Sequence, residues 1–500
     1  MKLPLPTRAP PMLGAALAFA LLTSAASAAA SSDAADEGLV AQAQASLGLP
    51  RPLGLAASWN PELVGASYAA LGAQLAQSHR TAALAPNLDV LRDSRRGDAS
   101  ATFGEDPFLA GELGVAAVSG LQSAGVRSVI GHFAGPGLPP PGADLGPVPV
   151  SPRELREVFV APFETVIRRA KPAGVLLSDN EIDGVPSQSS PALMHLLQEE
   201  LHFKGAVLSQ AGVAPGPLDA TLKATLDATT RPAPTALSEH AAAEGVVLLK
   251  NEGVLPLVPG VSMNVAVVKD ASPEALTKLA PPQQPYVLVL SGKLPAPSLA
   301  LTALAEGAKA VLAGFELGIH GDKALDDALY GRLNPGGKLP LSLARNPGQL
   351  PMFYNVKPSA WRGYLFDTTK PLYAFGWGLS YTQFKLSAPK LASRSIRIGQ
   401  PALLKISVSN TGTRAGDEVV QLYMHRRTSS TTEPIKQLVG FARVSLKPQE
   451  SKTLEMSVNP EQFAIWNLDM QRVQEPGQIE LMSGANSVDL KSVTLNVVKL

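Results

Sequence analysis

The chain has 500 residues, enough for two to four domains. Its 43 Lys and Arg against 42 Asp and Glu give a formal net charge of +1, which argues against a nucleic-acid or polyanion partner. Cysteine is absent, so thiol catalysis, disulfides and cysteine-ligated metals are excluded.

The first 28 residues have the pattern of a secretory signal. Lys2 and Arg8 form a positive start, Leu13–Leu22 is apolar, and Ala26-Ser27-Ala28 is a small-residue cleavage site. The alternative is a membrane anchor, but the apolar run is short for a bilayer. We expect cleavage, a secreted or periplasmic protein with no membrane span, and a linker over residues 29–45.

Alternating helix and strand patterns follow over residues 46–230. Asn60 and Pro61 fit the N-cap and first position of a helix, and Asp106-Pro107 fit the start of another. This alternation predicts a parallel sheet with both faces covered. A stretch of this length is at the lower limit for an eight-fold (β/α) barrel. We therefore expect a truncated or rearranged TIM-type barrel. The expected strands are Leu84–Val90, Ser128–Ile130, Gly174–Ser178 and Ala206–Leu208.

The rest of the chain predicts two further domains, which makes the fold class multidomain α/β. Residues 235–385 contain buried-strand candidates at Val265–Val268, Val287–Leu290 and Ala310–Ala313, as in an α/β sandwich. Residues 386–500 change to alternating strands separated by turns, which predicts a β-sandwich. Its expected strands are Leu404–Val408, Glu418–Met424, Ala442–Leu446 and Lys452–Val458.

The stretch from Leu196 to Val213 is the most informative for function. It reads as the end of a helix, a stop at Gly205 and a buried strand that delivers Ser209 and Gln210 at its C-terminal end. In a parallel α/β barrel, catalytic residues project from this end of the strands. Gln210 is therefore expected to face a substrate, although an amide is neither a nucleophilic carboxylate nor a proton donor.

The segment Phe203–Gln210 resembles the nucleophile motif of family-3 glycoside hydrolases, the β-glucosidase and β-xylosidase group. The resemblance continues in order along the chain, and its last part is similar to a fibronectin-III-like domain. It implies an exo-acting β-glycosidase fold, a β-linked glycoside or glycan as partner, and no cofactor or metal. The other matching segments are 103–107, 131–135, 179–186, 241–257, 334–340, 375–382 and 410–423.

The resemblance also shows which family positions are altered. The nucleophile Asp of the motif is Gln210, and the family's Lys-His pair is Gly131-His132. The last Arg of the family's Arg-Trp-Gly-Arg is Asp98, and the Tyr before Asn180 is Asp179. Only His132 survives, either as a sugar ligand or as a packed structural histidine.

A proton donor is also difficult to find. The resemblance places the family's acid/base Glu on a loop that here spans residues 269–286, where Glu274 is the only carboxylate beyond Asp270. Glu274 is expected to be a solvated loop residue.

The acidic segment has two other interpretations. Asp179, Glu181 and Asp183 suggest a cation site, but their spacing lacks the glycine and terminal Glu of an EF-hand, and a turn explains them. Asp179 is a substitute nucleophile in a second alternative, because it also follows a strand. Neither alternative is favoured.

Three hypotheses for function remain. The favoured one is a family-3 homologue that is weakly active or inactive, because retaining glycosidases need two carboxyl groups about 5 Å apart. The second is a non-catalytic protein that binds a glycan or another protein. The third is a degraded gene product without a role. The sequence leaves the oligomeric state open.

Overall fold

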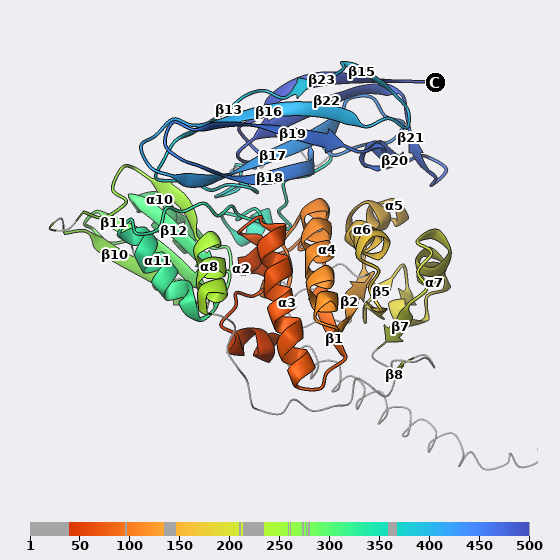
Figure 1. The fold of residues 1–500 in the computed structure, drawn as a ribbon, viewed down its shortest axis with the longest axis horizontal. Helices are drawn as coiled ribbons and strands as arrows, with labels where there is room; N and C mark the ends of the chain where they lie inside the picture. Colours follow the sequence, from red (N-terminus) through yellow and green to blue (C-terminus); the bar gives the residue numbers. More distant parts are fainter. Residues whose placement is uncertain are drawn as a thin grey trace, which may run out of the picture.

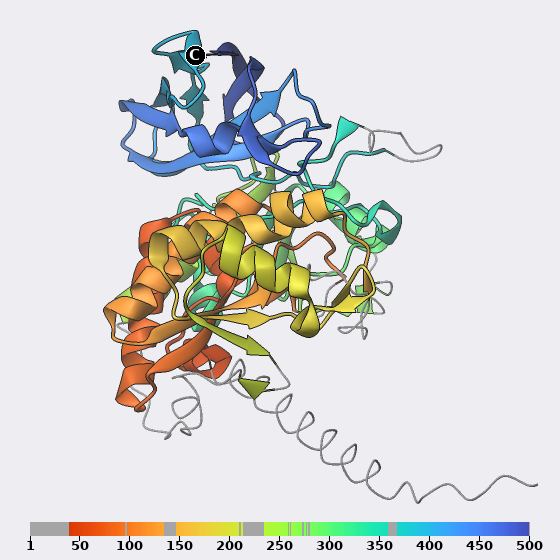
Figure 2. The same cartoon turned by 90° about the vertical axis from the view of Figure 1, so that its right-hand side faces the viewer.

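The computed structural model describes most of the chain, in three parts. In Figures 1 and 2, two α/β parts lie beside each other and a third part of β-sheet lies across both. No helix among the described residues is long and apolar enough to cross a membrane. The described residues are 40–95, 98–134, 147–209, 212–213, 235–258, 260, 262–272, 275–276, 278, 281–358 and 368–499.

The first part is built on an open sheet with strand order β1-β2-β4-β7-β8. The first four pair in parallel and β8 pairs antiparallel with β7. The prediction of a truncated or rearranged barrel is therefore confirmed, because the described residues supply four parallel strands in place of eight. The strands are β1 (Ala82–Asn87), β2 (Arg127–Phe133), β4 (Gly174–Leu177), β7 (Ala206–Ser209) and β8 (Gly212–Val213).

Helices cover one face of this sheet and bury the large core (Figure 1). Two predicted starts are confirmed: Asn60 accepts hydrogen bonds from the backbone N–H of Glu62 and Leu63, and Asp106 accepts one from Leu109. The helical elements are α2 (Pro52–Ala56), α3 (Pro61–Gln77), η1 (Ala99–Ala101), α4 (Pro107–Ser123), α5 (Pro152–Glu154), the π-helical turn η2 (Leu155–Val160), α6 (Ala161–Ala170), η3 (Ser187–Ser189), α7 (Pro191–His195) and the π-helical turn η4 (Leu196–Glu200).

Two further features belong to this part. A second small cluster of Val129, Leu176 and Leu208, with Leu84 packed against it, lies apart from the large helix-covered core. Residues 40–45, the end of the predicted linker, are helical, and Ala43 packs into the core. A small sheet beside the main one contains β3 (Pro147–Val148), β5 (Glu181–Ile182) and β6 (Val185–Pro186).

The second part is an α/β sandwich on the sheet β10-β11-β12-β9, in which only β9 is antiparallel. One prediction here is wrong: Val265 and Val267 of β10 are 39% and 60% exposed, because β10 is an edge strand. The elements are α8 (Thr235–Glu244), β9 (Val247–Asn251), β10 (Asn264–Lys269), β11 (Tyr286–Gly292), α10 (Leu299–Gly307), β12 (Ala310–Phe315), η5 (Gly318–His320), α11 (Gly321–Leu329) and η6 (Pro347–Gln349).

The third part is the predicted β-sandwich, and its core lies between two sheets. One sheet holds β13 (Phe384–Leu386), β14 (Lys390–Leu391), β16 (Ala402–Asn410) and β19 (Ser451–Val458). The other holds β15 (Ser395–Arg397), β17 (Gly416–Arg426), β18 (Gln437–Leu446), β22 (Gly477–Gly484) and β23 (Lys491–Val498). A 3-10 turn, η8 (Pro460–Phe463), precedes a hairpin of β20 (Ala464–Trp466) and β21 (Arg472–Gln474).

A buried hydrogen-bond cluster joins the three parts. The Glu105 carboxyl accepts from the Ser342 backbone N–H at 2.6 Å, the Ser342 hydroxyl at 2.9 Å and the Tyr354 backbone N–H at 2.9 Å. The Tyr354 hydroxyl donates to Asp106 and accepts from the Leu438 backbone N–H of β18, both at 2.7 Å. Both carboxyl groups are about 1% exposed, so the cluster fixes the parts relative to one another.

This cluster predicts that stability falls as the pH rises from mildly acidic to neutral. Burial raises the pKa of Glu105 to about 7 and that of Asp106 to about 6, against the nearby positive charge of Arg92. The folded state therefore binds more protons than the unfolded chain between about pH 4 and pH 7. The stability that these protons contribute is complete below about pH 4 and is lost as the pH rises to about 7.

The measurement is the melting temperature (Tm) at about pH 5 and about pH 7.5, with a lower value expected at the higher pH. Carboxylates with lowered pKa values, such as Asp93, act below about pH 4 and do not offset this trend. Glu105→Gln should flatten the dependence. An equal or higher Tm at about pH 7.5 would contradict the prediction.

Candidate active site

The candidate site lies at the C-terminal edge of the parallel sheet. β1, β2, β4 and β7 end at Asn87, Phe133, Leu177 and Ser209. Asn87 is in register with Gly131, and Phe133 with Leu177, so the ends of the first three strands meet at one edge. This is the edge where catalytic groups of parallel α/β folds lie.

His132 is held at this edge by Asp89. The His132 backbone N–H donates to Asp89 Oδ1, and His132 Nδ1 lies 3.0 Å from Asp89 Oδ2. The Asp89 side chain is 2% exposed and that of His132 is 22% exposed. Asp89 therefore fixes the orientation of the imidazole.

Sequence reasoning did not single out Asp89. The available signal was its place two residues after a parallel strand, where polar groups reach the functional edge. A carboxylate in a loop is too common to identify a histidine partner 43 positions away.

Gly131 leaves space at the edge. A Cβ atom at this position would meet Leu176 Cβ at 3.4 Å and Cδ2 at 3.6 Å, which is ordinary van der Waals contact. A Cβ atom is therefore sterically acceptable at Gly131.

Asp179 and Asn180 follow β4, the neighbour of β2. Asp179 accepts a hydrogen bond from the Gln188 side chain. Asn180 is 2% exposed and its Oδ1 accepts from Ser178 and Ser187. Gly131, His132 and Asp179 thus lie at the ends of adjoining strands.

The acidic segment after Asn180 forms a hairpin turn. Ile182 pairs with Val185, and the two residues between them, Asp183 and Gly184, have φ values of 53° and 75°. Positive φ at both positions is typical of a tight two-residue turn. No group of three or more potential metal ligands occurs among the described residues.

Asp98 lies elsewhere. Its carboxylate pairs with Arg51 Nη2 at 2.7 Å and accepts from the Ser100 hydroxyl at 2.7 Å. Arg51 directly precedes α2, so the structure brings a cation from a different element to the negative charge of Asp98. The predicted positions Gln210 and Glu274 lie outside the described residues.

Three family models match the chain. The model of the glycosyl hydrolase family 3 N terminal domain matches residues 25–224, and that of the family's C-terminal domain matches residues 269–381. The fibronectin type III-like domain model matches residues 418–487.

Curated relatives match over the same span. A beta-xylosidase of Formosa agariphila is 25% identical over 635 residues, which cover 90% of this chain and 87% of the relative. That alignment is longer than this chain, so the relative contains segments that this chain lacks. A periplasmic beta-glucosidase of Salmonella typhimurium is 34% identical over 268 residues, or 50% of this chain and 35% of the relative.

A solved structure also matches. The β-glucosidase of Erythrobacter marinus has a TM-score of 0.77 and 25% sequence identity, and the alignment covers 90% of this chain and 85% of that chain.

Proposed function

The chain belongs to glycosyl hydrolase family 3, and on that premise we propose that it is a divergent member with weak or no β-glycosidase activity. The observation that carries the proposal is the residue that directly follows β7. Position 210 is glutamine, where the family's nucleophile motif has aspartate. A retaining mechanism needs two carboxyl groups about 5 Å apart, and an amide cannot form the glycosyl-enzyme ester.

The neighbouring positions support the same proposal. Gly131 has no side chain to donate to a sugar hydroxyl, and Asp98 is occupied by its pair with Arg51. Asp179, the substitute nucleophile, accepts a hydrogen bond from Gln188. Loss of a member of a catalytic unit costs orders of magnitude in rate.

A second candidate function is non-catalytic binding of a glycan or a protein. The specific observation in its favour is His132, which keeps a buried carboxylate partner while the groups needed for bond cleavage are replaced. An imidazole held in one orientation beside Gly131, which has no side chain, suits binding of a hydroxyl-bearing ligand better than it suits bond cleavage.

We also propose secretion to the periplasm or the exterior. The support is the signal pattern of residues 1–28 and a relative named as periplasmic. The proposed domain limits are 46–230, 235–385 and 386–500. The positions of the three domain matches along the chain support these limits.

The test is hydrolysis of aryl β-glucosides and aryl β-xylosides by the purified protein. The expected turnover is far below the usual enzyme range of about 1 per second or more. Gln210→Ala is the matched control and should leave this trace rate unchanged, since the amide takes no part in it.

A rate of about 1 per second or more would overturn the proposal. Single substitutions of Asp179, Glu181 and Asp183 would then identify the active carboxylate. For the binding alternative, the readout is a rise in Tm with added glucose.

A further inference from the structure

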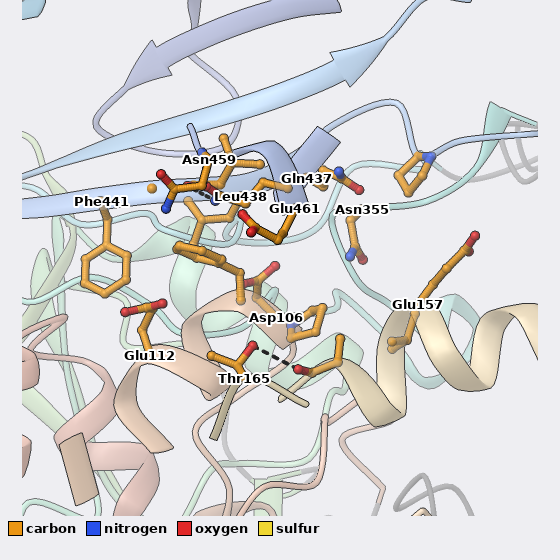
Figure 3. A pocket seen from close by; sticks show the side chains of 18 of the residues that line it. Asp106, Glu112, Glu157, Thr165, Asn355, Gln437, Leu438, Phe441, Asn459 and Glu461 are labelled. Atoms are coloured by element: carbon orange, nitrogen blue, oxygen red, sulfur yellow. Dashed lines mark hydrogen bonds between the residues drawn. The ribbon is translucent and has the colours of Figure 1, made fainter. Parts of the chain in front are cut away.

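A crevice of about 1380 Å³ separates the helices of the first part from the third part. One wall contains the N-terminal ends of α3 and α4 together with η2 and α6. The other contains β18, β19, η8 and β20. In Figure 3, Glu112, Glu157 and Thr165 lie on the helical side, and Phe441 and Asn459 lie on the strand side. The volume exceeds the roughly 300–1,000 Å³ of drug-sized pockets, so the space suits an elongated ligand.

The two walls are held in place by contacts between the parts. The Arg153 guanidinium donates to the backbone carbonyls of Trp466 and Asn467 at 3.0 and 2.7 Å. Arg443 donates to the Ser58 carbonyl at 2.8 Å, and Arg472 pairs with Glu164. A crevice fixed in this way is formed before a ligand arrives, which lowers the ordering cost of binding.

Several charges along the crevice are paired with one another. On the helical side, Glu112 pairs with Arg169. Glu157 of the same side pairs with Lys357 at 3.0 Å, and Glu244 lies 3.5 Å from Arg443. Carboxylates outnumber Lys and Arg side chains in the lining, so the crevice disfavours an anionic ligand, and the paired groups reduce its attraction to a cationic one. The arrangement favours a neutral ligand.

The other lining groups can both donate and accept hydrogen bonds. The amides of Asn355, Gln437 and Asn459 line the crevice. Amide side chains match hydroxyl groups, which also donate and accept. No other described residue hydrogen-bonds the side-chain amide of Gln437, which therefore has capacity for a ligand.

Aromatic side chains also line the crevice. Trp466 is half-buried at one end, with the Arg156 guanidinium 5.2 Å from its ring centre. Phe441 is half-buried on the strand side and packs against Phe108. Aromatic surfaces beside hydrogen-bonding groups suit a ligand with apolar C–H faces and a rim of hydroxyls.

We propose that this crevice binds a neutral oligosaccharide, as an accessory site apart from the sheet edge. It lies close to that edge, because Arg92 at its floor is three residues from Asp89, the partner of His132. Three residues span at most about 11 Å. The inference extends the proposed sugar-binding role and requires no hydrolysis.

The test is calorimetric titration of the purified full chain with cellohexaose and with xylohexaose. Trp466→Ala and Gln437→Ala should each weaken binding of the preferred hexaose about 10-fold, as expected for loss of one aromatic or amide contact. Tyr330→Ala is the matched control: Tyr330 is 50% exposed, has Arg332 over its ring and lies outside the crevice. It should leave the affinity unchanged.

The proposal is overturned if neither hexaose binds, or if both crevice variants bind as tightly as the parent chain while their Tm values show a folded protein. Saturable binding of a tryptic peptide mixture without hexaose binding would also overturn it. Thio-linked hexaoses, which resist cleavage, keep this test separate from the proposed loss of activity. The binding result therefore does not depend on whether the chain hydrolyses aryl glycosides.

Discussion

Gln210→Asp alone is expected to leave hydrolysis of aryl β-glucosides at trace rates. The substitution puts a carboxylate where the family's motif has one, but the sugar must also be held by hydrogen bonds that strengthen in the transition state. Gly131 offers none. A proton donor worth about 100-fold or more is also missing. Gln210→Asn is the matched control, because it has the same size as aspartate and no charge.

Adding Gly131→Lys and Asp98→Arg to Gln210→Asp should raise the rate about 100-fold, the usual effect of one restored transition-state hydrogen bond. Gly131→Lys places a Cβ atom 3.4 Å from Leu176, which is ordinary van der Waals contact. Asp98→Arg removes the half-exposed pair with Arg51, which is worth about 0–1 kcal/mol, and also places a second cation beside Arg51.

Clear activity of the single Gln210→Asp variant would contradict this expectation and would mean that the sugar pocket is intact. Inactivity of both variants, with no shift of Tm by glucose, would favour a scaffold kept for a role other than sugar chemistry. The two outcomes are separable, because the first appears in the rate and the second in both rate and Tm.

Glu105→Ala is expected to lower the free energy of unfolding by about 3 kcal/mol or more. Three donors, the backbone N–H and hydroxyl of Ser342 and the backbone N–H of Tyr354, lose their acceptor in a site that is about 1% exposed. Each buried group left without a partner costs about 1–3 kcal/mol. Urea unfolding monitored by circular dichroism measures the change.

Glu199→Ala is the control for this prediction, because Glu199 is exposed in η4. Its expected effect is within about 0.5 kcal/mol. Tyr354→Phe should fall between the two, since it removes the hydroxyl that joins Asp106 to β18. A Glu105→Ala chain as stable as Glu199→Ala would show that the cluster does not stabilise the joined parts.

The sequence predicted the elements and the fold class because local signals determine them. Asn60-Pro61 and Asp106-Pro107 specify helix starts through their side-chain acceptors and the fixed φ of proline. The apolar run Ala206–Leu208 predicted a strand, although Ala206 and Val207 are only partly buried in β7. The short length of residues 46–230, compared with the length of an eight-fold barrel, also predicted a sheet with fewer strands. The buried assignment of Val265 and Val267 failed, because a periodic pattern does not reveal whether a strand lies at an edge.

The sequence by itself determined the family, through segments in a fixed order, and the amide at position 210. Only the tertiary structure decided what surrounds the candidate site. The partner of His132 is 43 positions away, that of Asp98 is 47 positions away, and Ser342 reaches Glu105 across 237 positions. Such contacts depend on how the elements pack in space, and the pairing of distant residues leaves no periodic or local signal in one sequence.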